Sequence, residues 1–529
     1  MASTAAPRRG VPAAKLRPAP RHDVATLPVA NPALLVIGVM AATLMQVLDT
    51  TIANVAIPHM QSTLSATPDT ISWVLTSYII ASAVAMPITG WLADRIGSRK
   101  LFILSVAGFV IASMLCGMAQ SLTQMVLFRA LQGVAGAFIA PLSQAALLDT
   151  TRPSKQGQMI ALWGMGVMIG PILGPVLGGW ITENWSWRWC FYVNVPVGAA
   201  CLAIMMAELP SRPIVKRKFD LFGFALIAIA LSCLQLLLDR GNQRDWFSSF
   251  EICVYGFLIV SCVWIAAIHF VSSADPLFER SLFTNVNFVV ALVFMVVIGM
   301  VMFATMALLP TMLQGLFRYD VMDTGMALMP RGVGVLVTMQ LSAYVMRKGI
   351  DARWLVSIGF LIGAWSLYQM AGWSLDVDRY HIILSGFIQG LGIGLVFIPL
   401  QGMAFATLPP RLRTDGSSLL NLTRNVGSSI GISIMVTLLT RNTQTSHSDL
   451  ASHITPAMVD VIDLSALDRF GQYGDAALRL VDAMVSRQAA MIAYIDDFYL
   501  MMWLSLASVP LVLIMRKSRG GPTGPPPGR

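Results

Sequence analysis

An acidic residue inside an apolar segment is the first feature of this sequence that could do chemistry. Asp49 is the only carboxylate that we place deep in a predicted membrane span, here 33–58. An ionisable side chain in hydrocarbon costs about 2.5–3.5 kcal/mol, so such a residue marks a candidate functional site. Gln46, Thr50 and Asn54 recur beside it at helical spacing and form a polar face, which should point into a helix bundle or a water-filled cavity. The alternative, a packing acid whose hydrogen bonds are satisfied, stays open.

Arg129 is the natural partner for this acid. With a helical rise of about 1.5 Å per residue, Arg129 lies roughly 9 Å and Asp49 roughly 13 Å below the same membrane face. Burial disfavours an ionised carboxylate, whereas an adjacent guanidinium favours it. A pair that forms and breaks would therefore change the affinity of the acid for a proton. We expect Asp49 to take up a proton when a cavity opens outward and to release it inward, in competition with a second ligand.

The rest of the chain must position these two residues within a membrane. Of its 529 residues, 56% are hydrophobic and only 12% are charged, against about 25% charged in soluble domains. Apolar runs long enough to cross a bilayer follow one another along the sequence. We predict an all-α protein with fourteen spans at 33–58, 71–93, 101–119, 123–148, 159–182, 188–207, 221–238, 251–272, 287–310, 325–346, 354–373, 380–406, 416–441 and 498–515.

The distribution of basic residues predicts the orientation. An even number of spans puts both termini on one side, and segments on that side contain 24 of the 36 Lys and Arg residues. The positive-inside rule makes this side cytoplasmic. We therefore interpret the net charge of +9 as a topology signal rather than as a nucleic-acid patch. The six cysteines lie in apolar spans without paired spacing, so we expect no disulfide and no metal site.

A short internal repeat suggests two halves. Gln132-Gly133 in span 4 and Gln389-Gly390 in span 12 begin similar glycine-rich runs that end in Pro-Leu. Spans 1–6 and 9–14 would then correspond, with spans 7 and 8 inserted between them. The predicted regions are a disordered cytoplasmic N-terminus (1–32), an N-terminal half (33–207), a linker with two inserted helices (208–272), a C-terminal half (273–517) and a disordered tail (518–529).

Polar segments outside the spans form two further features. The outward loop 442–497 predicts a solvated linker with a short amphipathic helix before the last span, or alternatively a docking surface for another protein. On the inner side, the loop between spans 2 and 3 predicts a tight, charged connection. Its candidate gate residues, together with Asp149 at the end of span 4, are Gly90, Asp94, Arg95, Gly97 and Arg99. We expect Arg95 or Arg99 to reach Asp149.

Span 5 places small residues and two prolines on one face, which predicts a bending element buried between the halves. Its motif residues are Gly166, Gly170, Pro171, Gly174, Pro175 and Gly178. Span 13 has a polar face, in which Arg424 lacks an obvious acid, and we expect Arg331 to snorkel to the outer edge. Candidate residues lining a substrate cavity are Gln46, Asn54, Tyr78, Gln132, Trp163, Asn194, Asn421, Arg424 and Asn425.

These motifs resemble the drug:proton antiporters of the major facilitator superfamily, in particular the fourteen-span EmrB/QacA type. The span-1 run 48–58, the loop 90–100, the span-4 run 127–133, the span-5 run and the segment 187–198 each match a signature of that group. Ser98 stands where the loop signature usually has a basic residue. The segment 238–249 is similar to the EmrB branch, and the resemblance covers about Ala33 to Lys517.

The resemblance implies a function and partners. It implies a two-half major facilitator fold in a bacterial inner membrane and proton-driven export of hydrophobic or amphipathic compounds, with Asp49 and Arg129 in proton coupling. It also implies a periplasmic adaptor of the EmrA type and an outer-membrane channel of the TolC type. The sequence shows no nucleotide-binding loop or nucleophile–base set, so we expect no enzyme activity and no cofactor. A proton-coupled symporter, a lipid flippase and a transport-inactive sensor or scaffold remain alternatives.

Overall fold

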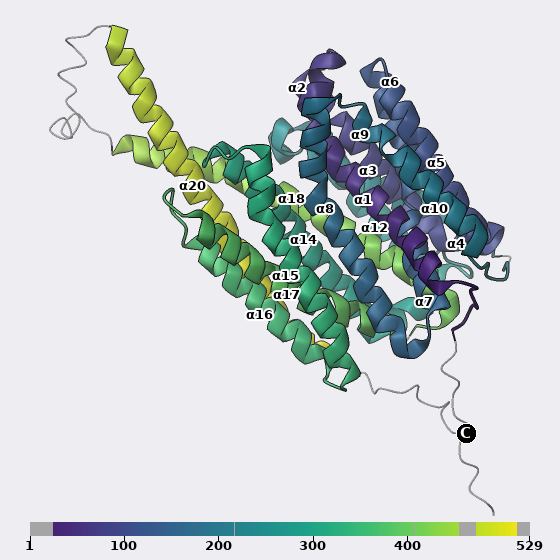
Figure 1. The fold of residues 1–529 in the computed structure, drawn as a ribbon. Helices are drawn as coiled ribbons and strands as arrows, with labels where there is room; N and C mark the ends of the chain where they lie inside the picture. The colour runs from purple at the N-terminus through teal and green to yellow at the C-terminus, as the bar shows by residue number, and fades with distance from the viewer. Residues whose placement is uncertain (1–24, 216, 407, 454–471, 516–529) are drawn as a thin grey trace, which may run out of the picture.

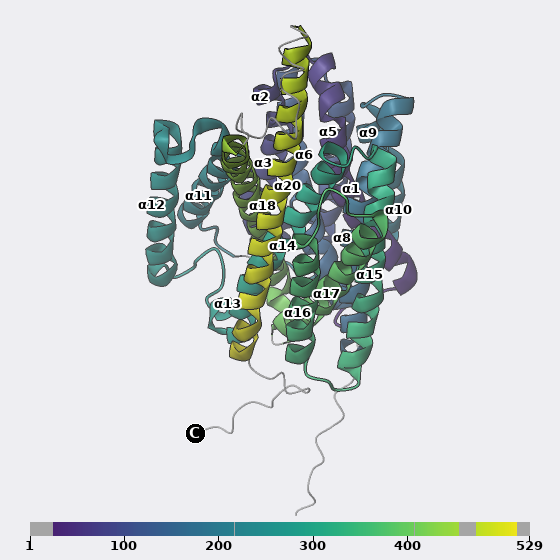
Figure 2. The ribbon, with the colours of Figure 1, turned by 90° about the vertical axis from the view of Figure 1, so that its left-hand side faces the viewer.

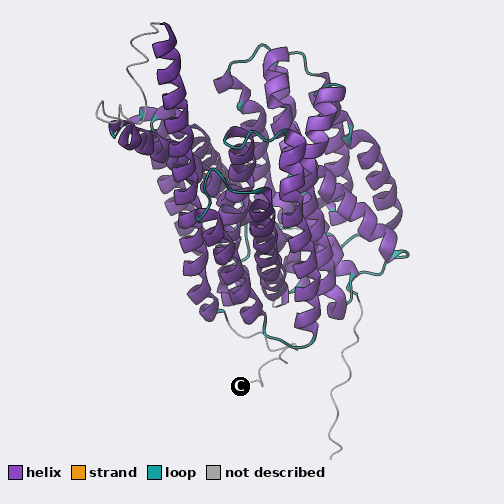
Figure 3. Ribbon diagram, turned by 60° about the vertical axis from the view of Figure 1, so that its left-hand side comes forward, coloured by secondary structure: helices purple, strands orange, loops and turns teal. Residues whose placement is uncertain are grey.

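The protein is a bundle of long helices that run roughly side by side (Figure 1). The computed structural model describes residues 25–515 except 216, 407 and 454–471. Within these residues only helices and connecting loops occur, as Figure 3 shows by colour. In this described part of the chain, thirteen candidate spans are long and apolar enough to cross a membrane. The predicted all-α membrane class is confirmed.

Helices of the N-terminal part pack on one another on one side of the bundle, at the purple and blue end of the colour bar in Figure 1. Their bounds are α1 (Pro32–Thr63), α2 (Pro68–Ile71), α3 (Trp73–Ala85) with η1 (Met86–Ile88) and α4 (Thr89–Ile96), α5 (Ser98–Met118), α6 (Leu122–Gly136) with α7 (Ile139–Thr150), η2 (Pro153–Lys155), α8 (Gln156–Asn184), α9 (Trp189–Tyr192) and α10 (Asn194–Glu208).

Helices of the C-terminal part form the green and yellow side of the bundle (Figure 1). They are α14 (Val286–Gly315), α15 (Val321–Arg347), α16 (Ala352–Ala371), α17 (Arg379–Ala406), η5 (Pro410–Leu412), α18 (Arg413–Ser452), α20 (Gln472–Leu511) and η7 (Val512–Ile514). Helix α15 corresponds to the predicted span 325–346. It is long enough to cross a membrane and packs among the others, although it is not one of the thirteen selected by hydropathy.

Two inserted helices stand at the periphery, beside α3 and α18 in Figure 2. The inner one is α11 and the outer one is α12. Residues 241–249 connect them with each other, and residues 273–285, which include α13, connect α12 with α14. Their bounds are α11 (Leu221–Arg240), η3 (Asn242–Arg244), η4 (Trp246–Ser248), α12 (Phe250–Ser272) and α13 (Ser281–Thr284).

Polar residues at helix N-termini fix where several of these helices begin. The side chains of Asn31, Ser121 and Asp220 accept hydrogen bonds from backbone N–H groups in the first turns of α1, α6 and α11. Such caps satisfy donors that would otherwise have no partner in an apolar environment. Helix α1 begins and α20 ends at the same end of the bundle, which we call the terminal end; the opposite end is the distal end.

The glycines of the span-5 motif lie against α1. A Cβ at Gly170 would lie 2.5 Å from the Val47 side chain, and one at Gly174 would lie 2.0 Å from Thr51 Oγ1. These glycines therefore let two helices of the same half approach closely. Helix α8 itself lies between the halves, because it packs on α1 and also on α15, although its small-residue face meets α1. The bending role of this helix stays a prediction. Contact with the other half uses another face of α8, where Val176 meets Gly325 of α15.

The predicted loop 442–497 is largely helical. Helix α18 continues to Ser452 and α20 begins at Gln472, so both helices extend beyond the distal end of the bundle (Figure 1). Residues 454–471 of this loop lie outside the described part. A helix does lead into the last span, as expected, because α20 begins at Gln472. The expectation of a linker directly after span 13 is wrong, because α18 continues to Ser452. The alternative of a docking surface stays a prediction.

Candidate functional site

Asp49 and Arg129 meet in the core of the N-terminal half. Arg129 Nη1 lies 2.7 Å from Asp49 Oδ2, and both side chains are fully buried. Asp49 comes from the middle of α1 and Arg129 from the second turn of α6. The sequence predicted similar depths in the membrane for Asp49 and Arg129, and in the structure the two side chains form a direct ion pair.

Two amides complete the surroundings of the carboxylate. Gln132 Nε2 and Asn194 Nδ2 donate to Asp49 Oδ1 over 2.8 and 2.7 Å. Arg129 also donates from Nη1 to Gln132 Oε1 over 2.8 Å and from Nε to the Val74 carbonyl over 3.2 Å. Charged groups buried with this many hydrogen bonds are stabilised in their ionised forms. Each carboxylate oxygen of Asp49 therefore accepts at least one hydrogen bond in this conformation.

Tyr78 connects the ion pair with a cavity. Its ring centroid lies 4.4 Å from the Arg129 guanidinium carbon, a cation–π contact. The same side chain lines a cavity of about 200 Å³, to which Thr50, the neighbour of Asp49, also contributes. On the other side, Asn425 of α18 belongs to the lining. The cavity therefore lies between the two halves and one side chain away from the buried charges.

Exposure increases along the polar face of α1 toward the distal end. Gln46 is 9% exposed, Thr50 is half-buried, and Asn54 is exposed. Because these residues follow one another at intervals of four, this face passes from tight packing to an accessible surface. Gln46 and Asn54 do not line the cavity at Tyr78, so they remain predicted substrate contacts.

Other predicted cavity residues lie in packed or hydrogen-bonded surroundings. Trp163 is fully buried in the apolar core. Asn421 is buried and donates to the Ser417 carbonyl over 2.9 Å. Arg424 is 7% exposed, and its Nε has no hydrogen-bond partner among the described residues. None of the three lines the cavity at Tyr78.

Arg331 does not snorkel. It is only 5% exposed, and its Nη2 donates to the Met302 carbonyl of α14 over 3.1 Å. The expectation of an outer-edge position is wrong because α15 turns this side chain toward α14 rather than toward the membrane surface.

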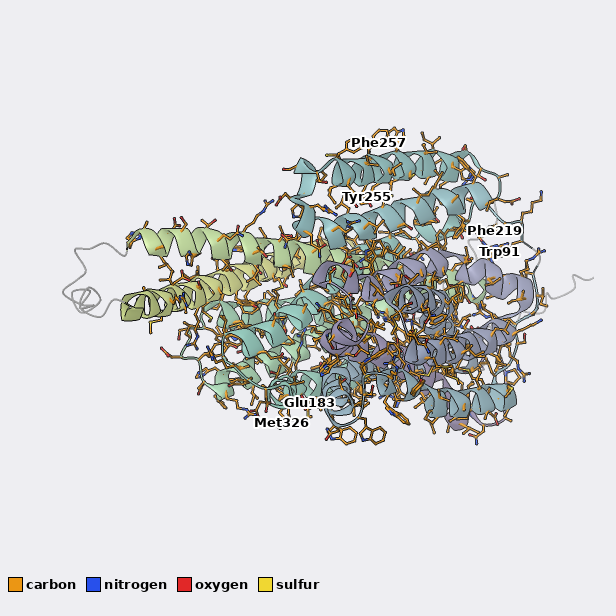
Figure 4. The ribbon with its side chains drawn as sticks, turned by 90° about the horizontal axis from the view of Figure 1, so that it is seen from above. Trp91, Glu183, Phe219, Tyr255, Phe257 and Met326 are labelled. Carbon is orange, nitrogen blue, oxygen red and sulfur yellow. The ribbon has the colours of Figure 1, made fainter. Side chains whose placement is uncertain are left out.

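Charged side chains link the halves at the terminal end. Arg217, in the connection between α10 and α11, lies 3.0 Å from both Asp94 of α4 and Asp415 of α18. Burial works to lower the pKa of Arg217, but these two carboxylates more than offset it, so its pKa lies above the ordinary value. Trp91 holds the same connection: its Nε1 donates to the Arg217 carbonyl over 3.1 Å, and its ring contacts Phe219 (Figure 4).

Asp149 is partnered differently from the expectation. It pairs with Arg212 of the connection and, over 3.0 Å, with Arg413 of α18. Arg99 instead donates to the Met206 carbonyl over 2.5 Å, and Arg95 stands over the Trp91 ring. The expected link from Arg95 or Arg99 to Asp149 is therefore wrong in this conformation.

Both loop glycines have a structural reason. A Cβ at Gly90 would lie 1.4 Å from Asp415 Oδ1, so only glycine lets the two helices meet here. Gly97 adopts φ +91°, a value that side-chain-bearing residues rarely take. That these glycines and the charged residues around them act as a gate stays a prediction.

Uncharged contacts reinforce this closure. The Gln144 amide of α7 bonds to Gln401 of α17 and accepts from Ser417 Oγ over 2.5 Å. Ser418 Oγ donates to the Met86 carbonyl over 2.5 Å. All these contacts join the two halves near the terminal end, so the halves are held together at that end in this conformation.

Sequence reasoning missed five charged residues that matter here. Arg212, Arg217, Arg413 and Asp415 take part in the terminal-end ion pairs. Asp497 lies in the candidate span Val481–Ile514 and is 1% exposed, and neither carboxylate oxygen has a hydrogen-bond partner among the described residues. Asp49 is therefore not the only buried acid in a spanning helix. The described residues contain no group of three His, Cys, Asp or Glu side chains that could hold a metal ion.

Comparisons with known proteins agree with this architecture. The family description Major Facilitator Superfamily matches residues 39–432. The structure resembles that of the human organic anion transporter MFSD10 with a TM-score of 0.55 and 13% identity, over 90% of this chain and 99% of that one. A bacterial homologue of the human lysosomal transporter Spinster, in an inward-facing and unoccupied conformation, gives a TM-score of 0.53 at 16% identity, over 91% and 98% of the two chains.

Sequence relatives are more similar. The chain is 36% identical to the multidrug export protein EmrB of Haemophilus influenzae, over 83% of this chain and 86% of that protein. It is 36% identical to the fatty acid resistance protein FarB of Neisseria gonorrhoeae (90% and 94%) and 34% identical to EmrB of Escherichia coli K12 (91% and 94%). The chain therefore belongs to the major facilitator superfamily, within the group that contains the EmrB multidrug export proteins.

Proposed function

We propose that this protein is a multidrug exporter that exchanges protons for hydrophobic or amphipathic compounds across a bacterial inner membrane. Two of the relatives above are named multidrug export proteins and one a fatty acid resistance protein. The observation that carries the proposal is the position of Tyr78, which both covers Arg129 and lines the cavity between the halves. A ligand at Tyr78 is thereby placed within reach of the buried ion pair.

Proton coupling follows from competition for Arg129. While Arg129 bonds to Asp49, the carboxylate is stabilised as the anion. A ligand that holds the Tyr78 ring against Arg129 would preserve the ion pair. A helix movement that draws the ring away would instead loosen Arg129, and an unpaired Asp49 in this apolar core would bind a proton. Protonation and ligand binding therefore oppose each other, which is the requirement for exchange.

Alternating access would use the terminal-end ion pairs. These pairs stabilise the state in which the terminal end is closed, and opening that end requires Asp149 to part from Arg413 and Arg217 to part from Asp415. The excess of Lys and Arg on the terminal side, 24 of 36 residues, supports a cytoplasmic location of both termini. Closure at that end corresponds to a cavity directed away from the cytoplasm.

A periplasmic adaptor of the EmrA type and an outer-membrane channel of the TolC type belong to the same proposal. The resemblance of the sequence to the EmrB group supports them. The helical extension of α18 and α20 at the distal end offers an accessible surface on the side where such an adaptor would lie.

The test is transport in proteoliposomes with an imposed pH gradient. We expect the wild type to move a fluorescent amphipathic dye only when a gradient is present, and to release protons against that dye. Asp49→Asn should abolish the dependence on the gradient, because an amide cannot exchange a proton. The matched control is Asp376→Asn, in the exposed connection between α16 and α17, which should behave like the wild type.

Opposite results would point elsewhere. Dye and proton movement in the same direction would identify a symporter, and movement of labelled lipid without competition from the dye would identify a flippase. If Asp49→Asn kept full gradient-driven exchange, the assignment of Asp49 would be wrong.

A further inference from the structure

The inserted helix α11 closes the cavity between the halves. Leu231, Leu234, Gln235 and Leu238 of α11 form one of its walls, opposite residues of α1, α3 and α18. Helix α12, by contrast, lies outside α11 and turns Phe257 away from the bundle (Figure 4), where the side chain is 71% exposed. The two inserted helices therefore occupy different environments, and of the two only α11 lines this cavity.

Hydrogen bonds join α11 to both halves. Thr76 Oγ1 of α3 donates to Asp239 Oδ2 over 2.5 Å, and Ser433 Oγ of α18 donates to the Leu238 carbonyl over 2.7 Å. A helix that merely filled space in the lipid would need neither bond. These contacts fix the position of the α11 face that carries Gln235.

The lining combines apolar surface with several free polar groups and no charge. Among the described lining residues, no acidic or basic side chain is present. Four polar side chains of the lining have no hydrogen bond to another described residue: Gln235, Asn425, Ser428 and Ser429. Unpaired polar groups that converge on an apolar cavity are the usual signature of a ligand site.

We infer that α11 is a wall of the ligand site and that Gln235 determines specificity there. The ligand class is an uncharged amphipathic molecule with hydrogen-bonding groups. At about 200 Å³ the cavity is smaller than typical pockets of about 300–1,000 Å³, so in this conformation it accommodates part of such a molecule. The inference rests on the proposed function only in taking this cavity as the binding site of the cargo.

The test measures binding rather than transport, so it does not depend on proton coupling. Purified protein in nanodiscs is titrated with Nile red, which is uncharged and accepts hydrogen bonds, and with rhodamine 6G, which is cationic. We expect Gln235→Leu to weaken Nile red binding about five- to tenfold through loss of one hydrogen bond. Gln235→Glu should change the ratio of the two Kd values at least about tenfold in favour of rhodamine 6G, because it introduces a charge into an uncharged site.

Controls separate specificity from folding. Gln369→Leu and Gln369→Glu make the same changes in α16, outside the cavity, and should leave both Kd values unchanged. Gln235→Asn keeps the amide and should bind Nile red within about threefold of the wild type. If the Kd ratio stays within twofold for every Gln235 variant that elutes as a monodisperse species, or if the wild type does not bind Nile red, the inference is wrong. Binding without gradient-driven transport would refute only the proposed function.

Discussion

The two halves treat buried charge differently. In the N-terminal half, Asp49 and Arg129 neutralise each other, and every oxygen of the carboxylate accepts a hydrogen bond. In the C-terminal half, Arg331, Arg424 and Asp497 are just as buried, but none of them has an oppositely charged partner among the described residues.

This difference indicates which half can bind and release a proton. A buried pair has two stable arrangements: joined and ionised, or separated with the acid protonated. A single buried charge has no partner to join, so it must be neutralised or solvated. The N-terminal half is therefore equipped to respond to a ligand, whereas the C-terminal half contains isolated polar groups whose burial costs stability.

The largest expected effect comes from removing one member of the pair. Arg129→Leu should lower the free energy of unfolding by about 3–5 kcal/mol, because it leaves Asp49 buried without its cation. Titration with SDS in mixed micelles, followed by tryptophan fluorescence, measures this change.

The matched control removes both charges. Asp49→Leu combined with Arg129→Leu should recover most of the lost stability, since an apolar pair of similar volume replaces a buried ion pair at little cost. A double variant as unstable as the single one would show that the packing of α6, and not the charge, is responsible.

The sequence was sufficient to pair Asp49 with Arg129. A spanning helix has a fixed rise per residue, so the distance of each side chain from its membrane edge could be read from the sequence. The same argument placed both residues on faces with other polar side chains. Gln132 and Asn194, which complete the carboxylate surroundings, were predicted only as cavity residues, because register within a bundle depends on packing that the sequence does not display.

The partners of Asp149 were not predictable in this way. Arg212 and Arg217 lie in a non-periodic connection, so no helical spacing relates them to Asp149 or Asp94. Asp497 was missed because the predicted span began one residue later, although α20 continues without interruption through that position. Boundaries drawn from hydropathy fail where a spanning helix extends into a polar region.

Replacing a single buried charge in the C-terminal half by a neutral side chain should change the free energy of unfolding in the opposite direction. Arg424→Met should raise the free energy of unfolding by about 1–3 kcal/mol, because it removes a buried polar group without a partner. The exposed Arg347→Met in α15 should change it by less than about 0.5 kcal/mol. The same SDS titration applies.

Transport by Arg424→Met sharpens the comparison. A variant that is more stable but transports less would mean that Arg424 is retained for a ligand or for a second conformation. If Arg424→Met were destabilised, the arginine would have a partner that contributes to the fold, and the contrast between the halves would fail.

The smallest effect is expected at the exposed ion pair of Glu279 and Arg411 at the terminal end, over 2.5 Å. Burial works to raise the pKa of Glu279, but the Ser281 hydroxyl and the Arg411 guanidinium together lower it by more, so its pKa lies below the ordinary value of 4.5. A lowered folded-state pKa contributes stability above the unfolded-state pKa, and this stability is lost as the pH falls through the folded-state pKa. Glu279→Gln should therefore cost less than about 1 kcal/mol at pH 7. The difference from the wild type should shrink as the pH falls below about 4.5, the usual Glu range. Unfolding titrations at several pH values check this, and a cost as large as that of Arg129→Leu would show that burial is not what distinguishes the strong pair from the weak one.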